Sequence, residues 1–120
     1  MSYKQGEIWL VNLEPTIGAE MTKLRPCLIV SDDTIGKLPL RTVVPITNWS
    51  DSFGSIPWMV KLVPNSQNNL SKPSSADAFQ VKNLSIKRFD KKIGEISEET
   101  LFKIHSKIAK TLKINYKLSY

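Results

Sequence analysis

The stretch Lys23-Leu-Arg-Pro-Cys-Leu-Ile-Val-Ser31 passes from a charged loop into an almost unbroken apolar run. A short apolar run without alternation is typical of a β-strand that is buried on both faces. We therefore expect residues 26–31 to form an interior strand. Arg25 stands directly before this strand, so its guanidinium is expected at the edge of the core, in contact with solvent.

Four further segments have the composition of strands. They are rich in β-branched, aromatic and aliphatic residues and are bounded by Gly, Pro or polar clusters. These segments are Glu7–Leu13, Arg41–Thr47, Trp58–Val63 and Ala78–Lys82. Pro45 lies inside one of them, and because proline has no N–H to donate, we expect it at a sheet edge or a bulge. The long connecting loops are Glu14–Leu24, Asn48–Pro57 and Pro64–Ser75.

An amphipathic helix is expected after Ser97, which is a good N-cap, with Glu98 and Glu99 in the first turn. At about 100° per residue, apolar side chains share one face and lysines share the opposite face. The apolar residues are Leu101, Ile104, Ile108 and Leu112, and the lysines are Lys103, Lys107, Lys110 and Lys117. A short helical turn over Ile86–Phe89 is expected after Ser85. Five short strands and one late helix, without βαβ alternation, indicate a mainly β (α+β) fold, a small twisted barrel with a C-terminal helix.

The composition narrows the class of protein. The chain has 120 residues, of which 41% are hydrophobic and 23% are charged, which suits one globular domain over residues 1–120. It contains no apolar run of about 18 residues, so we expect no membrane span. Residues Met1–Glu7 contain no long apolar segment before a small-residue cleavage site, so we expect no secretory signal. A single cysteine, Cys27, excludes an internal disulfide and a cysteine-based zinc site, which favours a reducing cytosol. A single histidine, His105, excludes a two-histidine acid–base pair within one chain.

The net charge of +6 is unevenly distributed. Residues 1–81 carry seven basic and seven acidic side chains, whereas residues 82–120 carry ten basic and four acidic ones. A localised basic region suits a polyanion or an acidic protein as partner. A solvated lysine face on the last helix explains the same charge equally well.

Most candidate reactive residues have a structural interpretation. His105 is expected to be packed or at an interface, and Cys27 to be an inert core residue. The neighbouring acids, Asp32–Asp33 and Glu98–Glu99, point apart and give little support to paired-carboxylate chemistry. The sequence contains no P-loop, no G-x-G-x-x-G and no H-E-x-x-H motif.

Arg25 is more informative, because an arginine stays protonated and its planar fork suits phosphate. The alternative is an arginine at the start of a strand that pairs with an acid such as Glu20. Thr47 ends a strand at the mouth of a loop, where it is either functional or an ordinary β-branched residue. Gln80 is expected within a strand, where a buried amide needs a partner.

Three aromatic residues, Trp49, Phe53 and Trp58, surround one loop. If they are exposed beside Arg25, they are platforms on which unpaired bases can stack. If they point inward, they belong to the core. Trp58 begins a strand and is the one most expected in the core.

Several motifs in order along the chain resemble the PemK/MazF toxins, the ribonuclease halves of bacterial toxin–antitoxin pairs. They are Gly6-Glu-Ile-Trp-Leu-Val-Asn-Leu-Glu-Pro-Thr-Ile-Gly-Ala-Glu20, the Lys23–Ser31 stretch, Val43-Val-Pro-Ile-Thr47 and Phe79-Gln-Val-Lys82. The resemblance implies an SH3-like barrel, a homodimer and a cytoplasmic location. It further implies cleavage of single-stranded RNA at short motifs without a metal or other cofactor. Neutralisation is implied to come from an antitoxin that lays an acidic, disordered tail over the RNA groove.

By position, the resemblance implies that Arg25 and Thr47 are the catalytic arginine and threonine. The sequence departs from the family directly before Gln80, where Phe79 replaces an aspartate that serves the site in some relatives and the nearest acid is Asp77. This departure leaves the base preference and the role of Asp77 open. The residues expected to bind RNA are Glu20, Lys23, Asn48, Trp49, Phe53, Asp77, Gln80 and Lys82.

Cleavage without a metal uses the ribose 2′-OH as nucleophile, so the protein must mainly orient the substrate and stabilise negative charge. Arg25 is expected to hold the scissile phosphate, and Thr47 to hydrogen-bond that phosphate or the 2′-OH. A hydroxyl is too weak a base to act alone, so the residues leave the general acid and base open. Two alternatives are a non-catalytic toxin that grips a protein such as DNA gyrase and a family member that binds RNA without cutting it. A phosphate-holding arginine beside a hydroxyl favours the nuclease over the protein-binding toxin.

Overall fold

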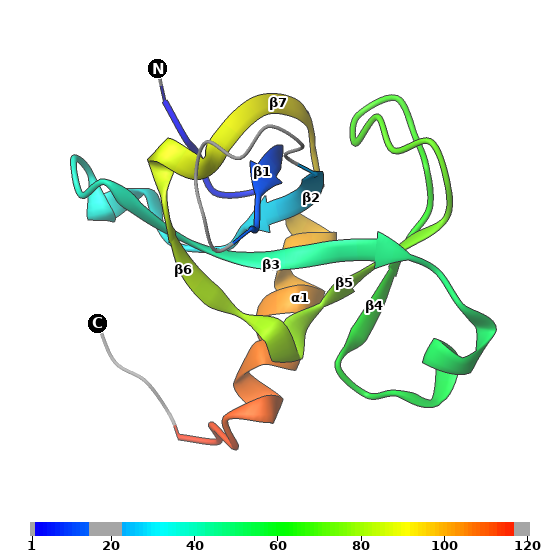
Figure 1. Cartoon of the computed structure of the whole chain (residues 1–120). Helices are drawn as coiled ribbons and strands as arrows, with labels where there is room; N and C mark the ends of the chain where they lie inside the picture. Colours follow the sequence, from blue (N-terminus) through cyan, green and yellow to red (C-terminus); the bar gives the residue numbers. More distant parts are fainter. Residues whose placement is uncertain (1, 15–22, 117–120) are drawn as a thin grey trace.

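The computed structural model describes residues 2–14 and 23–116. Within these ranges the chain forms a curved antiparallel sheet of seven strands followed by one α-helix (Figure 1). The elements are β1 (Glu7–Asn12), β2 (Leu24–Ile29), β3 (Leu40–Asn48), β4 (Met59–Leu62), β5 (Ser74–Asp77), β6 (Lys82–Ser85), β7 (Phe89–Glu95) and α1 (Glu98–Thr111). The strands are paired in the order β4-β5-β3-β2-β1-β7, and β6 pairs with β3 beside β5. The expected mainly β fold with a late helix is confirmed.

Four short 3₁₀ helices lie in the connections of the described residues. They are η1 (Asp33–Ile35), η2 (Asp51–Ser55), η3 (Ala78–Gln80) and η4 (Ile86–Arg88). The expected cap of the last one is confirmed, because the Ser85 hydroxyl accepts a hydrogen bond from Lys87 N at 3.2 Å. None of the helices in the described ranges has the length and apolar content needed to cross a bilayer.

Strand β2 is buried on both faces, as its apolar run predicts. Cys27, Leu28 and Ile29 have no exposed surface. Cys27 and Ile29 pack in one hydrophobic cluster and Leu28 packs in the other. Strand β2 therefore separates two cores, and its N-terminal end, where Arg25 lies, is exposed to solvent.

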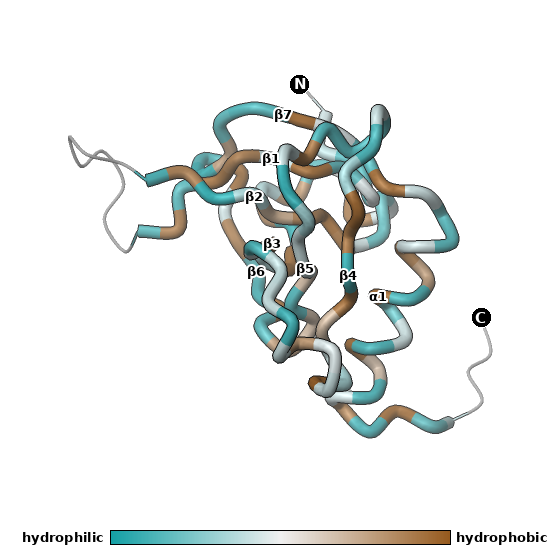
Figure 2. Tube along the Cα trace, turned by 90° about the vertical axis from the view of Figure 1, so that its right-hand side faces the viewer, coloured by the Kyte–Doolittle hydropathy of each residue, from teal (hydrophilic) through white to brown (hydrophobic). Residues whose placement is uncertain are grey.

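The two cores lie on opposite faces of the sheet. One joins the sheet to α1 and contains Ile8, Leu28, Val30, Val44, Ile46, Val60, Leu62, Ala76 and Ile104. The other lies within the curve of the sheet and contains Trp9, Val11, Cys27, Ile29, Val43 and Phe89. Figure 2 shows α1 running beside β4, with hydrophobic and hydrophilic residues alternating along the helix.

Helix α1 begins as predicted, because the Ser97 hydroxyl accepts a hydrogen bond from Thr100 N at 3.2 Å. Ile104 is fully buried, and Leu101 and Ile108 pack against the same core. The prediction was wrong for Leu112, which is 62% exposed. The helix ends at Thr111, and Leu112 is its C-cap, beyond the last turn that reaches the sheet.

The segment around Gln80 differs from the prediction. The expected strand over Ala78–Lys82 is wrong, because residues 78–80 form η3 between β5 and β6. The first two residues of β5, Ser74 and Ser75, lie within the predicted loop Pro64–Ser75. Both are buried, but serine gives no apolar signal in the sequence. Strand β7 was not predicted either. Gln80 consequently leaves the sheet and is exposed.

Pro45 lies in β3, an interior strand, rather than at an edge of the sheet. On one side it pairs with Cys27 of β2. On the other side β6 pairs with β3 only as far as Val43, and β5 pairs with it only from Ile46 onward. Proline is therefore tolerated at a gap in the hydrogen-bond ladder. Among the described strands, no neighbour requires an N–H at this position, just as none would at a sheet edge.

A buried carboxylate ties the N-terminal segment to β7. Glu7 Oε1 accepts hydrogen bonds from Lys4 N at 2.8 Å and Trp9 Nε1 at 3.0 Å, and Glu7 Oε2 lies 3.0 Å from Lys92 Nζ. Burial by itself raises the pKa of Glu7, but these hydrogen bonds outweigh it and hold the pKa below the usual 4.5.

This network predicts a pH dependence of stability. Because the pKa of Glu7 is lower in the folded state, its contribution is complete above about pH 4.5 and disappears as the pH falls through the folded value. We expect the melting temperature of the native chain to exceed that of Glu7→Gln at pH 7, and the difference to shrink as the pH falls to about 3. Thermal unfolding of both proteins between pH 7 and about pH 3 measures the difference in melting temperature. A constant difference at every pH would contradict the assignment.

Candidate nucleic-acid interface

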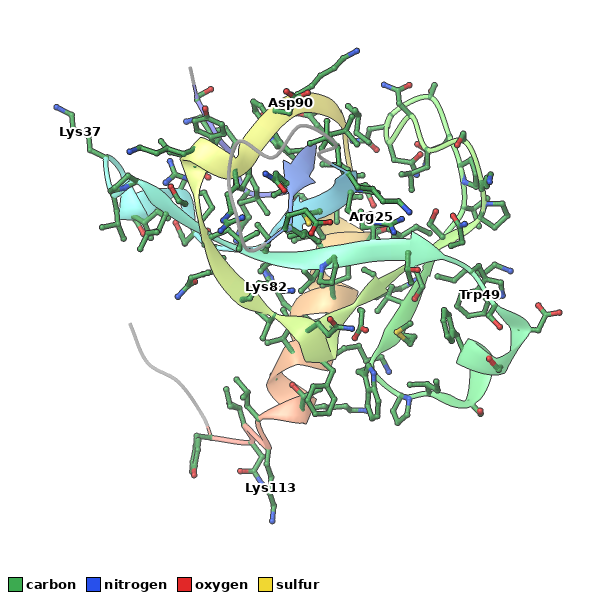
Figure 3. All side chains as sticks on the ribbon, viewed as in Figure 1. Arg25, Lys37, Trp49, Lys82, Asp90 and Lys113 are labelled. Carbon is green, nitrogen blue, oxygen red and sulfur yellow. The ribbon has the colours of Figure 1, made fainter. Side chains whose placement is uncertain are left out.

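A solvent-facing groove of about 290 Å³ lies where β2 begins beside the end of β3. It is lined by Leu13, Arg25, Pro26, Pro45, Ile46, Thr47, Asn48 and Ser74. Both residues predicted to be catalytic, Arg25 and Thr47, therefore line one concave surface. Figure 3 shows Arg25 beside the C-terminal end of β3, which carries Thr47.

Sheet register explains why these two side chains meet. Cys27 of β2 pairs with Pro45 of β3. Continuing the antiparallel register by two residues places Arg25 opposite Thr47, and opposed residues project from the same face of a sheet. A slip of one residue would turn one of the two side chains to the other face.

The groove offers a free positive charge beside neutral polar groups. Arg25 is exposed and forms no hydrogen bond or ion pair with any described residue. Thr47 and Asn48 are also exposed and supply a hydroxyl and an amide. No carboxylate is among the described residues that line the groove, so an anion there meets attraction without repulsion. Glu20, which was predicted to bind RNA and which would pair with Arg25 in the alternative interpretation, lies outside the described residues.

Comparison with known proteins identifies the family. Residues 4–112 match the family model of the PemK-like, MazF-like toxins of type II toxin–antitoxin systems. The chain belongs to this family. It is 32% identical over 104 residues to endoribonuclease MazF9 of Mycobacterium tuberculosis, a match that covers 82% of this chain and 86% of that protein. It is 25% identical over 112 residues to endoribonuclease MazF of Staphylococcus epidermidis, covering 93% and 92% of the two chains.

The fold is that of solved MazF structures. A mycobacterial endoribonuclease solved in complex with its cognate antitoxin superposes with a TM-score of 0.76 at 20% identity, covering 97% of this chain and all of that one. The family model therefore confirms the family indicated by the sequence motifs, and the solved structure has the same fold.

Lys82, predicted to bind RNA, lies on the same face of the sheet as the groove. It pairs with Val43 of β3, so the two side chains project from one face, as do those of Arg25 and Thr47 farther along the strands.

Burial raises the pKa of the Cys27 thiol to about 12, and the positive charge of Lys82 acts in the opposite direction. The interpretation of Cys27 as an inert core residue is confirmed.

Asp77 and Gln80 are held together outside the groove. Asp77 caps η3 by accepting a hydrogen bond from Phe79 N at 3.1 Å, and it also accepts one from Gln80 Nε2 at 2.8 Å. Asp77 therefore orients the exposed amide of Gln80, which needs no buried partner. Phe79, which occupies the position of an aspartate in some relatives, is 60% exposed.

The aromatic residues near the groove separate into two pairs. Trp49 packs edge-to-face against Phe53 at 5.8 Å, and Lys61 Nζ lies 5.0 Å from the centre of the Trp49 ring. Both rings are half-buried beside Asn48, and they do not line the groove. Trp58 packs instead against Phe79. The expectation that Trp58 belongs to the core is wrong, because it is half-buried and outside both hydrophobic clusters.

Two remaining candidates have simple placements. Lys23 is exposed one residue before β2 and does not line the groove. His105 joins α1 to the sheet, since its Nε2 lies 2.9 Å from the Val30 carbonyl oxygen. The interpretation of His105 as a packed residue is confirmed. Sequence reasoning missed Ser74 and Leu13, which line the groove because β5 and the end of β1 adjoin β3 and β2.

Proposed function

We propose that this chain is a sequence-specific, metal-independent endoribonuclease that cleaves single-stranded RNA, and mRNA in particular, as the toxin of a toxin–antitoxin pair. The observation that carries the proposal is the shared groove of Arg25 and Thr47. The two relatives at 32% and 25% identity, both described as endoribonucleases, support the same activity. We place the chain in the cytoplasm, where mRNA is found, as one domain over residues 1–120.

The proposed reaction is an internal transfer within the RNA. The ribose 2′-oxygen attacks the adjacent phosphorus, and the bond from phosphorus to the 5′-oxygen of the next nucleotide breaks. The 2′-OH loses a proton and the departing 5′-oxygen gains one, which leaves a 2′,3′-cyclic phosphate and a 5′-OH. Because the nucleophile belongs to the substrate, orientation and charge stabilisation are the tasks left to the protein.

Arg25 and Thr47 divide these tasks. The Arg25 guanidinium holds the scissile phosphate and stabilises the charge that develops on its oxygens, since it remains protonated and donates in a planar fork. The Thr47 hydroxyl hydrogen-bonds the phosphate or the 2′-OH and relays a proton through it. Asn48 adds a neutral amide at the rim of the groove. We propose Glu20, Lys23, Trp49, Phe53, Asp77, Gln80 and Lys82 as further contacts along the RNA.

We propose two protein partners. The solved complex of a mycobacterial endoribonuclease with its cognate antitoxin supports an antitoxin as the first partner, and we propose that this antitoxin is acidic. The second partner is another copy of this chain. One flank of α1 and the residues after it leave apolar side chains in solvent, which is the surface that a symmetric dimer would cover. These side chains are Phe102, Leu112, Ile114 and Tyr116.

Incubation of the purified chain with a long transcript in excess EDTA tests the activity, and primer extension maps the ends. We expect full cleavage at a recurring short motif, with 2′,3′-cyclic phosphate and 5′-OH termini. Strict dependence on added Mg²⁺ would contradict the metal-independent reaction. RNA binding without any cleavage would identify a member of the family that no longer cuts.

A further inference from the structure

A second cavity, of about 300 Å³, lies on a different part of the molecule from the Arg25–Thr47 groove. It is lined by Pro57, Trp58, Phe79, Lys107, Lys110 and Thr111. These residues come from the segment before β4, from η3 and from the last two turns of α1. The two cavities share no lining residue. We call this second cavity the aromatic–lysine pocket.

The floor of the aromatic–lysine pocket is apolar. Trp58 and Phe79 meet edge-to-face with their ring centres 5.0 Å apart. Phe79 nevertheless leaves 60% of its surface in solvent, so a large apolar area remains to be covered. The only hydroxyl in the lining, that of Thr111, already donates to the Ile108 carbonyl oxygen at 2.7 Å. Apart from the Trp58 indole N–H, the described residues of the floor therefore offer contact area and almost no free hydrogen-bonding groups.

The rim of the pocket carries two positive charges without counter-charges. Lys107 and Lys110 are three residues apart on α1 and therefore neighbours on its surface. Neither forms an ion pair within the described residues, and no acid lines the pocket. The nearest acid along η3, Asp77, is already engaged with Phe79 N and Gln80. The two ammonium groups are therefore available to a ligand.

We propose that the aromatic–lysine pocket is a docking site for an acidic peptide segment that places one bulky apolar side chain on Trp58 and Phe79. Carboxylates flanking that side chain pair with Lys107 and Lys110. This inference rests on the proposed function in one respect, since it takes the antitoxin as the protein that carries the segment. It adds an anchor point outside the groove in which RNA is cleaved.

The lining favours a peptide side chain over a nucleobase. A base carries donors and acceptors around its edge, and the floor offers them a single free partner, the Trp58 N–H, so each further edge group buried there would stay unpaired at a cost of about 1–3 kcal/mol. A leucine or aromatic side chain has no such edge. Charge complementarity between two lysines and flanking carboxylates then fixes the orientation of the peptide.

The pocket stays open in the proposed dimer. At about 100° per residue, Lys107, Lys110 and Thr111 lie on one flank of α1, and Phe102 and Leu112 lie on the other. Occupation of the pocket is therefore compatible with a second copy of the chain on the Phe102 flank. Docking at the pocket leaves Arg25 and Thr47 untouched, so it adds affinity without itself blocking the groove.

Affinity for the labelled, purified full-length antitoxin tests the proposal, with RNA cleavage measured on the same proteins. The variants are Phe79→Ser and the double variant Lys107→Glu/Lys110→Glu. The matched control is Lys103→Glu/Lys113→Glu, which changes the net charge equally but outside the pocket, with Lys103 on α1 and Lys113 two residues after the end of that helix. We expect both pocket variants to weaken antitoxin binding about tenfold or more. The control should stay within about threefold, because exposed charges that do not touch the ligand contribute little, and cleavage without antitoxin should be unchanged in all three variants.

Each other outcome decides against the inference. If the native chain cleaves RNA and binds antitoxin, and the pocket variants bind it equally well, the inference fails and the proposed function stands. If the pocket variants instead raise KM for RNA, the pocket is part of the RNA path. If the native chain neither cleaves RNA nor binds the antitoxin, the proposed function fails and the inference fails with it. Circular dichroism of every variant verifies the fold. The two pocket variants remove different features, the aromatic ring of Phe79 and the charges of Lys107 and Lys110, so a misfolded protein in one case leaves the other as a test.

Discussion

Replacing Arg25 with alanine is expected to lower the rate of RNA cleavage by about 100–1,000-fold, the usual cost of removing one donor that stabilises transition-state charge. The reason is the position of its guanidinium, which lines the groove with Thr47 and pairs with no described residue. Single-turnover cleavage of an oligonucleotide that contains the mapped motif measures the loss. Full activity of Arg25→Ala would end the proposed mechanism.

The fold should survive this change, because an exposed arginine without a partner contributes little to stability. The matched control is Lys37→Ala, which removes an exposed cation at the far end of the molecule from Arg25 (Figure 3). Its cleavage rate should equal that of the native chain, and an equal loss in both variants would show that net charge alone matters. Thr47→Ala should cost less than Arg25→Ala, and a larger loss would reverse the two roles.

The sequence predicted those parts of the fold in which the residues themselves show an apolar run, a helix cap or a β-rich composition. The apolar run after Arg25 identified the interior strand β2, and Ser97 with two glutamates identified the start of α1. The β-rich segments that became β1, β3 and β4 were also found. In each case local propensity and burial agree, so the sequence is informative without knowledge of neighbours.

Two strands that the sequence did not predict, β5 and β7, are formed by pairing with neighbouring strands and have no strand pattern of their own. Strand β7 contains Asp90, Lys91 and Lys92 in succession, all exposed, and its pairing with β1 is interrupted by two register shifts. No period-2 pattern survives such shifts, so the segment resembles a loop. Strand β5 is buried through small serines, which have no apolar signature.

The candidate site was predictable only in part. Arg25 stood out because a charge precedes a buried run, but Thr47 was selected through the resemblance to PemK/MazF toxins. Their meeting depends on the pairing register of β2 with β3, which a single sequence does not reveal. The aromatic–lysine pocket was likewise invisible, since it joins three segments that are distant in sequence.

The loop between β4 and β5 is fastened to β7, and this contact helps to position the groove. Gln67 O accepts a hydrogen bond from Glu95 N at 3.0 Å, and Asn69 Nδ2 donates to Ile93 O at 2.8 Å. The loop ends at Ser74, which lines the groove. Gly94 lies beneath the loop, and a Cβ atom there would stand 2.3 Å from the backbone oxygen of Asn68.

Gly94→Ala is therefore expected to destabilise the fold by about 3 kcal/mol, the upper part of the usual range for overpacking. The atoms in the way are backbone atoms of Gln67 and Asn68, so no side-chain rotation relieves the clash. The loop has little freedom to move, because the buried Asn68 side chain bonds Asn65 N, Leu70 N and the Val63 carbonyl oxygen. Thermal unfolding should show a fall in melting temperature on the order of 10 °C.

Gly54→Ala is the control for this substitution. A Cβ at Gly54 meets nothing within 4 Å, and its backbone angle is one that alanine adopts. The same change of residue should therefore leave the melting temperature unaltered or raise it slightly, because alanine reduces the entropy of the unfolded chain. Equal melting temperatures for the two variants would show that the loop moves away from β7 without cost. In that case the contact at Gly94 would not be what holds Ser74 at the groove.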